Sequence, residues 1–578
     1  MSGWKNKRDV AAGRLRMPID RWRRGAPTPR SGVCAAGASR GAGTPPPFSL
    51  VSLVLIRSLP RPILVFFAAF ALAFTACTQR DPAPAGGTSN SPPVLRLSQR
   101  NEPASLDPAT TTLPDEFGTL RALLEGLLLP GANGGAPLPG AAHRFEVSPD
   151  GLSYTFHLRP EARWSDGAPV TATHFIAAYR RALTPATAAP KASVFSDVKN
   201  AAAYVSGQLA DFSAVGFHAA GPHTLTITLE RPNPRFPYYV ASGPWLPVRT
   251  DVVARHGRNW TRPDHFVGNG PFLLAEWRAD QRIVVRKNPR WHGAAGVQLA
   301  EIHFLRFDSG DSEDRAYRAG QLDATMAVPF SKVPVYTRER PAELHRAPMI
   351  ETRYLAFDTR RPALSRDARR ALSLAIDRTK IVERVLQGGQ IAASQFVPPQ
   401  LRPATPPPPG STAHDPAAAR RLLAQAGFPG GRGFPKFELS GWTQSQVLEA
   451  IQQMWREELG VEVAISVREA KVHLDALRTG GFDIAFMTSI PDVADRAAML
   501  ADFTSGAPLN YPRWSSSAFD AALAAGRFDV AEEHLLEAAA VAPLYFNTKI
   551  SLMSPRIRGW QEDGLWARCY HDVHLAGK

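Results

Sequence analysis

Three short segments of the chain alternate apolar and polar side chains with a period of two. Residues 154–158 alternate Tyr, Phe and Leu with Thr and His, residues 225–229 alternate Leu and Ile with Thr, and residues 461–467 alternate Val and Ile with polar or small residues. Because successive side chains of a strand point to opposite faces, each segment predicts a strand with one buried and one wet face.

Other segments carry apolar residues at helical spacing between capping residues. Asp415, followed by proline, is an N-cap for a helix predicted to end at Gly427, and a second helix is predicted over residues 365–387, before two glycines. A third helix, over residues 448–459, turns at Gly460 directly into the 461–467 strand. Helices that alternate with strands through tight turns predict a mixed α/β protein.

A run of apolar or small residues, 63–76, ends at Cys77 and follows Arg57 and Arg61. Fourteen residues are short for a membrane-spanning helix, which needs about 20, but they fit the hydrophobic region of a secretory signal. The residues before the cysteine resemble a bacterial lipobox, with Phe74 where Leu is usual. We therefore expect Cys77 to be lipidated and to become the mature N-terminus; an ordinary signal peptide or a short anchor with an unmodified Cys77 is the alternative.

The expected leader and lipoprotein signal peptide cover residues 1–76, of which 1–56 suggest a start codon assigned too far upstream. Residues 77–93, rich in Pro, Gly and Ser, form the expected tether between anchor and globular body. The leader holds twelve Lys or Arg against two Asp, so most of the formal charge of +15 lies there. The remaining 55 basic and 50 acidic side chains are too balanced to suggest a nucleic-acid partner.

Length and motifs narrow the function further. A chain of 578 residues predicts two or three lobes, and three cysteines exclude a disulfide framework. Phosphate-loop, nucleophile-elbow, H-E-x-x-H and C-x-x-C motifs are all missing from the sequence, which disfavours an enzyme. His571 and His574, near Cys569 and Asp572, have the spacing of a metal site on a helix. We expect this segment to be an exposed polar tail instead, and no metal site is predicted.

Several blocks in collinear order resemble the family-5 solute-binding proteins of bacterial ABC transporters, which include oligopeptide, dipeptide, nickel and murein-peptide receptors. The most specific block is residues 154–179, YTFHLRPEARWSDGAPVTATHFIAAY, in which His174 replaces an Asp of the family signature. The others include residues 102–108 (EPASLDP), 124–127 (LEGL), 267–272 (VGNGPF), 286–291 (RKNPRW) and 371–381 (ALSLAIDRTKI). The 154–179 signature itself predicts a strand, a turn and a helix capped by Thr171, and so a part of the fold rather than of the pocket.

The resemblance implies an α/β fold of the periplasmic-binding-protein type II kind, with two lobes, a hinge and an additional small domain. The boundaries expected from it are lobe I over residues 94–118, 219–305 and 545–578, the extra domain over 119–218, and lobe II over 306–544. It implies a receptor that closes its lobes around a short peptide without covalent chemistry or a cofactor, and delivers the peptide to ABC permease and ATPase subunits.

The resemblance also implies the binding residues. In the family an Asp in a loop after the sequence F-D-[IV]-A binds the α-amino group of the peptide, and Asp492 falls on that position, with Asp495 close enough to confuse the alignment. Phe486 and Ser489 stand where oligopeptide receptors carry Arg and Trp, so the ligand class itself is open. The further candidate ligand-binding residues are Asn269, Gly270, Glu102, Tyr545 and Asn547, whereas Tyr204, Trp245 and Trp442 are expected in the core.

We expect a monomer in the periplasm or cell envelope, held by its lipid at either membrane. Thr78 after the cysteine favours the outer membrane if the envelope is Gram-negative. A nickel, haem or other solute receptor of the same family is one alternative, and a signalling or structural lipoprotein that kept the fold is another. Peptide length, side-chain preference and the partner permease are not decided by the sequence.

Overall fold

The computed structural model describes residues 92–100, 102–112, 116–402, 413–442, 445–566 and 568–577, all within one compact unit, Asn90–Lys578. Cys34, Cys77, the leader and nearly all of the tether lie outside the described residues. Among the described residues no helix combines the length and the apolar character needed to cross a bilayer.

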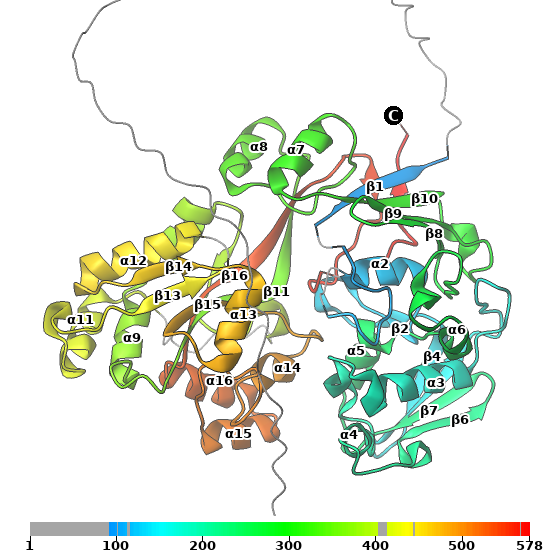
Figure 1. The fold of residues 1–578 in the computed structure, drawn as a ribbon, viewed down its shortest axis with the longest axis horizontal. Helices are drawn as coiled ribbons and strands as arrows, with labels where there is room; N and C mark the ends of the chain where they lie inside the picture. The colour runs from blue at the N-terminus through cyan, green and yellow to red at the C-terminus, as the bar shows by residue number, and fades with distance from the viewer. Residues whose placement is uncertain are drawn as a thin grey trace, which may run out of the picture. The chain divides into compact units, whose positions relative to one another are not determined.

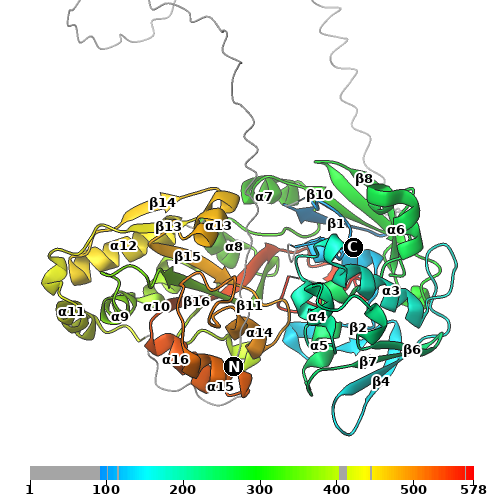
Figure 2. The same ribbon diagram turned by 60° about the horizontal axis from the view of Figure 1, so that its bottom comes forward.

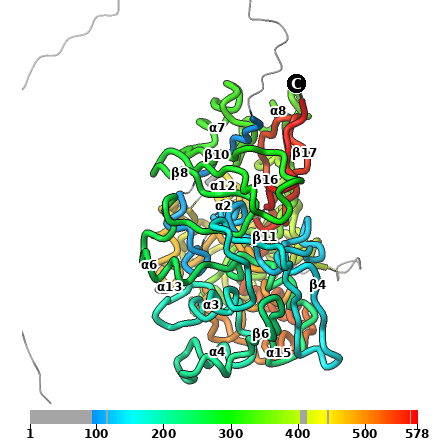
Figure 3. Tube along the Cα trace, turned by 90° about the vertical axis from the view of Figure 1, so that its right-hand side faces the viewer, coloured from blue at the N-terminus to red at the C-terminus, as the bar shows by residue number. Residues whose placement is uncertain are grey.

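Two four-stranded sheets lie in the part of the chain before residue 310 (Figure 1). The first joins the N-terminal strand to a later hairpin, in the order β1 (Val94–Gln99), β10 (Glu301–Arg306), β9 (Arg282–Lys287) and β8 (Phe272–Arg278). The second is fully antiparallel, in the order β4 (Ala142–Val147), β5 (Ser153–Leu158), β7 (Thr224–Thr228) and β6 (Phe217–Gly221). Figure 3 places β4 and β6 at the opposite end from β8 and β10.

The helices of this part pack on one continuous apolar core that includes Trp164, Trp245 and Tyr204. They are α2 (Glu116–Leu123), α3 (Ala172–Leu183), α4 (Ala201–Val205), α5 (Phe236–Val240) and α6 (Thr250–His256). Helix α3 begins where expected, because Thr171 and His174 form a capping box. His174, which replaces the Asp of the family signature, thus supplies the side-chain acceptor of this capping box. A small pair, β2 (Leu128–Leu129) and β3 (Leu138–Pro139), links α2 to β4.

A six-stranded sheet forms the centre of the other part. Its order is β12 (Ile391–Ala392), β16 (Val541–Leu552), β11 (Leu344–Phe357), β15 (Ile484–Ser489), β13 (Glu438–Gly441) and β14 (Ala464–Val467). Separate apolar clusters cover its two faces. One face carries α9 (Arg366–Leu374), α11 (Pro416–Gln425) and α12 (Ser445–Leu459); the other carries α14 (Arg496–Ala501), α15 (Ser517–Ala524) and α16 (Phe528–Glu537), as Figure 2 shows.

The remaining elements flank these sheets. Helices α7 (Gly310–Arg318) and α8 (Val333–Glu339) share a small core with the ends of β11 and β16. Helix α13 (Ala470–Thr479) leads into β15, α10 (Arg378–Lys380) follows α9, and β17 (Ile557–Arg558) pairs with β18 (His574–Leu575) near the C-terminus.

Most predicted elements are present. The alternating segments are β5 and β7, Asp415 caps α11 by accepting a hydrogen bond from the Ala418 amide, and Gly427 has a positive φ of 96°. Two expectations were wrong in detail. The helix predicted over 365–387 ends at Leu374 and restarts at α10, because the Asp377 side chain caps a new turn there, which continues as a π-helix over Ile381–Leu386.

The second difference concerns the 461–467 strand. Val461 and Val463 are buried as expected, but the strand proper begins at Ala464, and Val467 is 52% exposed. Strand β14 is the last strand of its sheet, so the final valine has a neighbouring strand on one side only. A period-two pattern therefore located the strand but not how far its buried face extends.

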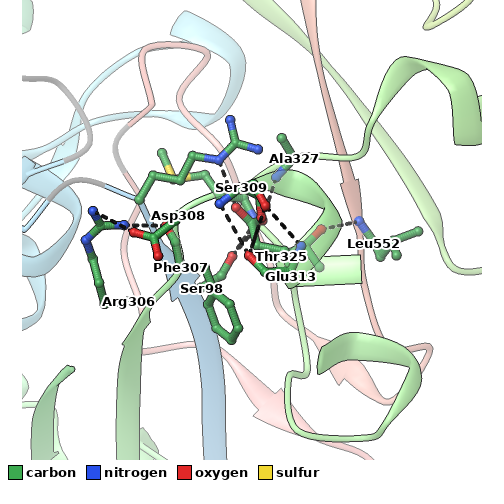
Figure 4. Close-up of polar contacts among 12 residues, drawn as sticks. Ser98, Arg306, Phe307, Asp308, Ser309, Glu313, Thr325, Ala327 and Leu552 are labelled. Carbon is green, nitrogen blue, oxygen red and sulfur yellow. Dashed lines mark hydrogen bonds and ion pairs between the residues drawn. The ribbon is translucent and has the colours of Figure 1, made fainter. Parts of the chain in front are cut away.

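A buried carboxylate ties the two parts together where the chain crosses between them (Figure 4). Glu313 of α7 is fully buried and accepts hydrogen bonds from Ser98 Oγ of β1, at 3.0 Å, and from the Met326 amide, at 2.8 Å. The same crossing segment pairs with the end of β16, where the Leu552 amide donates to Thr325 Oγ1 at 2.8 Å. Strand β16 is itself continuous through the expected boundary at 544/545, and its residues up to Leu552 pair with β11.

Candidate functional site

The candidate site is a cavity of about 70 Å³ that both parts of the fold line. Phe117 and Arg121 of α2 form one wall, Tyr238 and residues 241–244 extend it, and Asp563 closes one side. The six-stranded sheet contributes only the loop over residues 491–494, which follows β15. A cavity with walls from two cores can change size when those cores move apart.

Asp492 lies on the wall of this cavity. Strand β15 ends at Ser489, and α14 begins only after Asp495, so the intervening loop carries Asp492 beyond the sheet edge. Its carboxylate forms an ion pair with the ammonium of Lys191, 301 residues away in sequence, and the two side chains are 40% and 19% exposed. The sequence-predicted carboxylate is therefore in the cavity, and a cation already contacts it.

Asp495, the alternative to Asp492 as the carboxylate that binds the amino group, does not line the cavity. Its carboxylate is nearly buried, accepts a hydrogen bond from the Tyr239 hydroxyl at 3.3 Å and lies 3.7 Å from Arg235 Nε. Burial raises the pKa of Asp495 above its ordinary value. Asp495 thus binds the loop to the neighbouring wall, and Asp492 is the better placed of the two for a ligand.

Four charged residues of the site were missed from the sequence. Lys191, Arg121 and Asp563 line the cavity, and Asp502, at the end of α14, lies close enough to Asp492 for their charges to interact. Burial, with a further contribution from the charge of Asp492, raises the pKa of Asp502 to about 7. Only Arg121 could have been suspected from the sequence, because it is a lone Arg in the otherwise apolar stretch before the LEGL block.

Asn269 and Gly270 do not line the cavity but hold the helix that does. The Asn269 amide exchanges two hydrogen bonds with the backbone of Glu125, at 2.8 and 3.0 Å, and the Gly270 amide donates to Leu123 O at 3.0 Å. A Cβ at Gly270 would lie 2.5 Å from the carbonyl carbon of Leu123, so only glycine fits. Both residues fix the C-terminal end of α2, one turn from Arg121.

The other three candidates are dispersed. Glu102 accepts hydrogen bonds from Trp277 Nε1, at 2.8 Å, and from the Asp280 amide, at 2.5 Å, beside the β8–β9 hairpin. Tyr545 is fully buried in the core of the six-stranded sheet, and Asn547 is half-buried two residues further along β16. None of these three lines the cavity that holds Asp492.

The position of Phe486, where oligopeptide receptors carry an Arg, is nevertheless close to a guanidinium. Phe486 is fully buried, and Arg353 from the adjacent strand β11 lies 5.9 Å from its ring and 5.7 Å from the ring of Trp442. The charge of Arg353 is already balanced by an ion pair, because its Nε lies 2.6 Å from Oε1 of the buried Glu351. Trp245 and Tyr204 are core residues, as predicted, whereas Trp442 is only partly buried.

The C-terminal His and Cys residues do not gather. Among the described residues no group of three or more His, Cys, Asp or Glu is arranged to hold a metal ion. Cys569 is half-buried, and desolvation raises the pKa of its thiol to about 11, which keeps it protonated at neutral pH.

Two α/β parts that share a charged cavity and are joined by crossing strands define a solute-binding protein with two lobes. Comparison with known proteins agrees: residues 136–511 match the model of the bacterial extracellular solute-binding proteins, family 5. The chain belongs to this family, as the sequence blocks predicted, and it has the two-lobed type II periplasmic binding fold.

Three relatives illustrate the range of named ligands. The probable deoxycholate-binding periplasmic protein of Escherichia coli is 31% identical over 81% of this chain and 90% of its own length. The periplasmic murein peptide-binding protein of the same species is 31% identical over 82% of this chain and 92% of its own, and its solved structure has a TM-score of 0.75, covering 84% of this chain and 99% of that one. The Haemophilus influenzae oligopeptide-binding protein, solved in complex with RPPGFSPFR, is 26% identical with a TM-score of 0.72, covering 84% and 100%. All three are binding proteins by name.

Proposed function

We propose that this chain is the extracytoplasmic receptor of an ABC importer and that it binds short peptides with a free amino terminus. The observation that carries the proposal is the ion pair between Asp492 and Lys191 on the cavity wall. An ammonium group already occupies the carboxylate to which the α-ammonium of a peptide is expected to bind. The Lys191 side chain therefore acts as an internal placeholder that the ligand displaces.

The size of the cavity supports binding by lobe movement. A volume of about 70 Å³ holds about five water molecules, far less than a peptide needs. The cavity must widen for the ligand to enter and then close around it, and the opposite walls belong to different cores, so opening does not require either core to be disrupted. Relatives named for murein peptide and oligopeptide binding support the same ligand class.

The test replaces Asp492 by Asn, which keeps the shape and removes the charge. A charge-assisted hydrogen bond contributes about 1.5–3 kcal/mol, so free-amine peptides should bind about 10 to 150 times more weakly. N-acetylated peptides bring no ammonium and should lose much less. Isothermal titration of both peptide forms against both proteins measures this, and equal losses for the two forms would show that the amine binds elsewhere or that the ligand is not such a peptide.

A bile acid is the second candidate ligand, because one relative at 31% identity is named for deoxycholate and because Phe486 and Ser489 depart from the oligopeptide receptors. A thermal-shift panel separates the candidates: saturating ligand at 100 times its dissociation constant adds about 2.7 kcal/mol to the free energy of unfolding. Stabilisation by deoxycholate and by no peptide would favour the bile acid, and stabilisation by Ni²⁺ that a chelator abolishes would favour a metal receptor.

The envelope location is part of the proposal. We propose that residues 1–76 are removed, that Cys77 carries the lipid and that the protein works as a tethered monomer with its permease and ATPase subunits. Cys77→Ala should move the protein from the membrane fraction to the soluble periplasmic fraction and leave the melting temperature unchanged, as immunoblots of fractionated cells would show. A variant that stays in the membrane fraction would contradict the lipid anchor.

A further inference from the structure

The cavity holds a second polar site, formed by Arg121 and Ser242. Arg121 is 6% exposed, and one of its nitrogens, Nη2, donates to Ala241 O at 2.7 Å. Among the residues that the structure describes, no hydrogen-bond partner contacts its buried Nε and Nη1. The next residue after Ala241, Ser242, also lines the cavity, and its buried hydroxyl has no partner within the same described part of the chain. Guanidinium and hydroxyl donors are thus held side by side through Ala241.

Two other buried guanidinium groups, those of Arg378 and Arg369, are better satisfied. Arg378, 5% exposed, donates to Pro543 O, Ser373 O and Ser373 Oγ, and Arg369 donates to three backbone carbonyls. Neither borders the cavity. A buried ion without enough partners costs several kcal/mol, so the donors that Arg121 leaves open favour the entry of an anion.

The charges around the cavity lead to the same conclusion. Among the described lining residues, Arg121 and Lys191 are the two cationic side chains and Asp492 and Asp563 the two carboxylates, so this part of the wall is formally neutral before a ligand binds. A ligand that brings only an α-ammonium adds one positive charge to an enclosed space. The C-terminal carboxylate of a longer peptide lies too far from the amino group to enter the same small cavity. A carboxylate close to the amino group restores the balance there, and charge balance matters most where water is excluded.

We infer that the ligand carries a carboxylate close to its amino group, within its first two residues, and that Arg121 and Ser242 bind this carboxylate. This inference rests on the proposed function and narrows its substrate class to amino-terminal acidic peptides. Asp492 binds the ammonium at one side of the cavity, and the guanidinium of Arg121 forms charge-assisted hydrogen bonds with the carboxylate at the other.

The experiment compares acidic and amide peptides that are otherwise alike. Ala-Glu-Ala and Ala-Gln-Ala, and Glu-Ala-Ala and Gln-Ala-Ala, all with amidated C-termini, differ only in one carboxylate near the free amine. Isothermal titration of the wild-type protein should show a preference of about 10- to 150-fold for Glu over Gln in at least one pair. Wild-type binding of both members within twofold in both pairs would overturn the inference.

Three variants assign that preference to its residues. Arg121→Gln should reduce the Glu-to-Gln ratio to within about twofold, Arg121→Lys should keep part of it, and Ser242→Ala should lower it by a smaller factor. Arg163→Gln is the matched control, since Arg163 also donates to backbone carbonyls but lies outside the cavity wall, and it should keep the full ratio.

The outcomes separate this inference from the proposed function. If peptides bind with a strong Glu preference that survives in Arg121→Gln, the carboxylate binds elsewhere and the inference fails while the peptide function stands. If no free-amine peptide binds the wild type, the proposed function fails and the inference with it. Should Arg121→Gln not fold, the wild-type ratio together with Arg121→Lys and Ser242→Ala still decides the matter.

Discussion

The Lys191 placeholder makes a quantitative prediction for Lys191→Met. Met retains most of the aliphatic side chain but has no ammonium, so the variant leaves Asp492 without its internal partner. An incoming peptide then no longer has to break the ion pair before its own ammonium binds. Affinity for free-amine peptides should therefore rise, which is the opposite of what loss of an ordinary ligand contact produces.

The structure sets the size of this gain. The Asp492 side chain is 40% exposed and that of Lys191 19%, so the pair is partly solvated and falls in the range of about 0.2–1 kcal/mol measured for exposed ion pairs. The expected increase in affinity is about 1.4- to 5-fold. It should shrink at high salt, because exposed pairs are screened over about 8 Å at physiological ionic strength.

The assay is isothermal titration with a free-amine peptide and its N-acetyl form, at low and high salt. Lys199→Met is the matched control: Lys199 belongs to the same region but is exposed and does not line the cavity. The acetylated peptide should show no gain with Lys191→Met, and Lys199→Met should show none with either peptide. If Lys191→Met weakens free-amine binding, then Lys191 binds the ligand directly and is no placeholder.

Two stability predictions follow from buried carboxylates. The pKa of Asp502 is raised to about 7, so between about pH 4 and pH 7 the folded protein holds a proton that the unfolded chain has released. The contribution of this group to the free energy of unfolding therefore falls as the pH rises from 4 to 7. Asp502→Asn should stabilise the folded protein by about 1–2 kcal/mol at pH 8 but not at pH 4. Urea unfolding at the two pH values measures this, and equal effects at both would refute the shifted pKa. Glu313→Gln removes a fully buried charge, but its partner Arg100 is 39% exposed and stays solvated. The new amide NH2 must face either Arg100 or the Met326 amide, both of which are donors, so unfolding should become easier by about 1–3 kcal/mol. A change below about 1 kcal/mol would contradict the proposed role of Glu313 in joining the two parts.

Local sequence patterns determined the elements whose stabilising contacts are close in the chain. The cap at Asp415, the capping box at Thr171 and the left-handed turn at Gly460 depend on residues within four positions, so they could be predicted. A competing local signal also explains why the helix predicted over residues 365–387 was wrong. Its apolar residues keep helical spacing throughout, but Asp377 inside it caps a new turn, and the periodicity concealed this cap.

The site was predictable only where the family blocks reached it. The block resemblance selected Asp492 from its place in the loop after the F-D-I-A sequence, and the structure puts it on the cavity wall. It also selected Asn269 and Gly270, which the structure shows supporting α2 from outside the cavity. A residue conspicuous in a motif can serve the fold beside a site, and the sequence does not distinguish the two roles.

Tertiary structure alone decided the electrostatics of the site. Lys191 meets Asp492 across 301 positions, and Arg121 meets the Ala241 carbonyl across 120, so no sequence pattern links either pair. Charge pairing and desolvation depend on distance and burial in space, which is why the raised pKa of Asp502 and the open donors of Arg121 and Ser242 become visible only once the chain is folded. The sequence determined that this is a two-lobed binding protein; folding determined which charges its cavity leaves for the ligand.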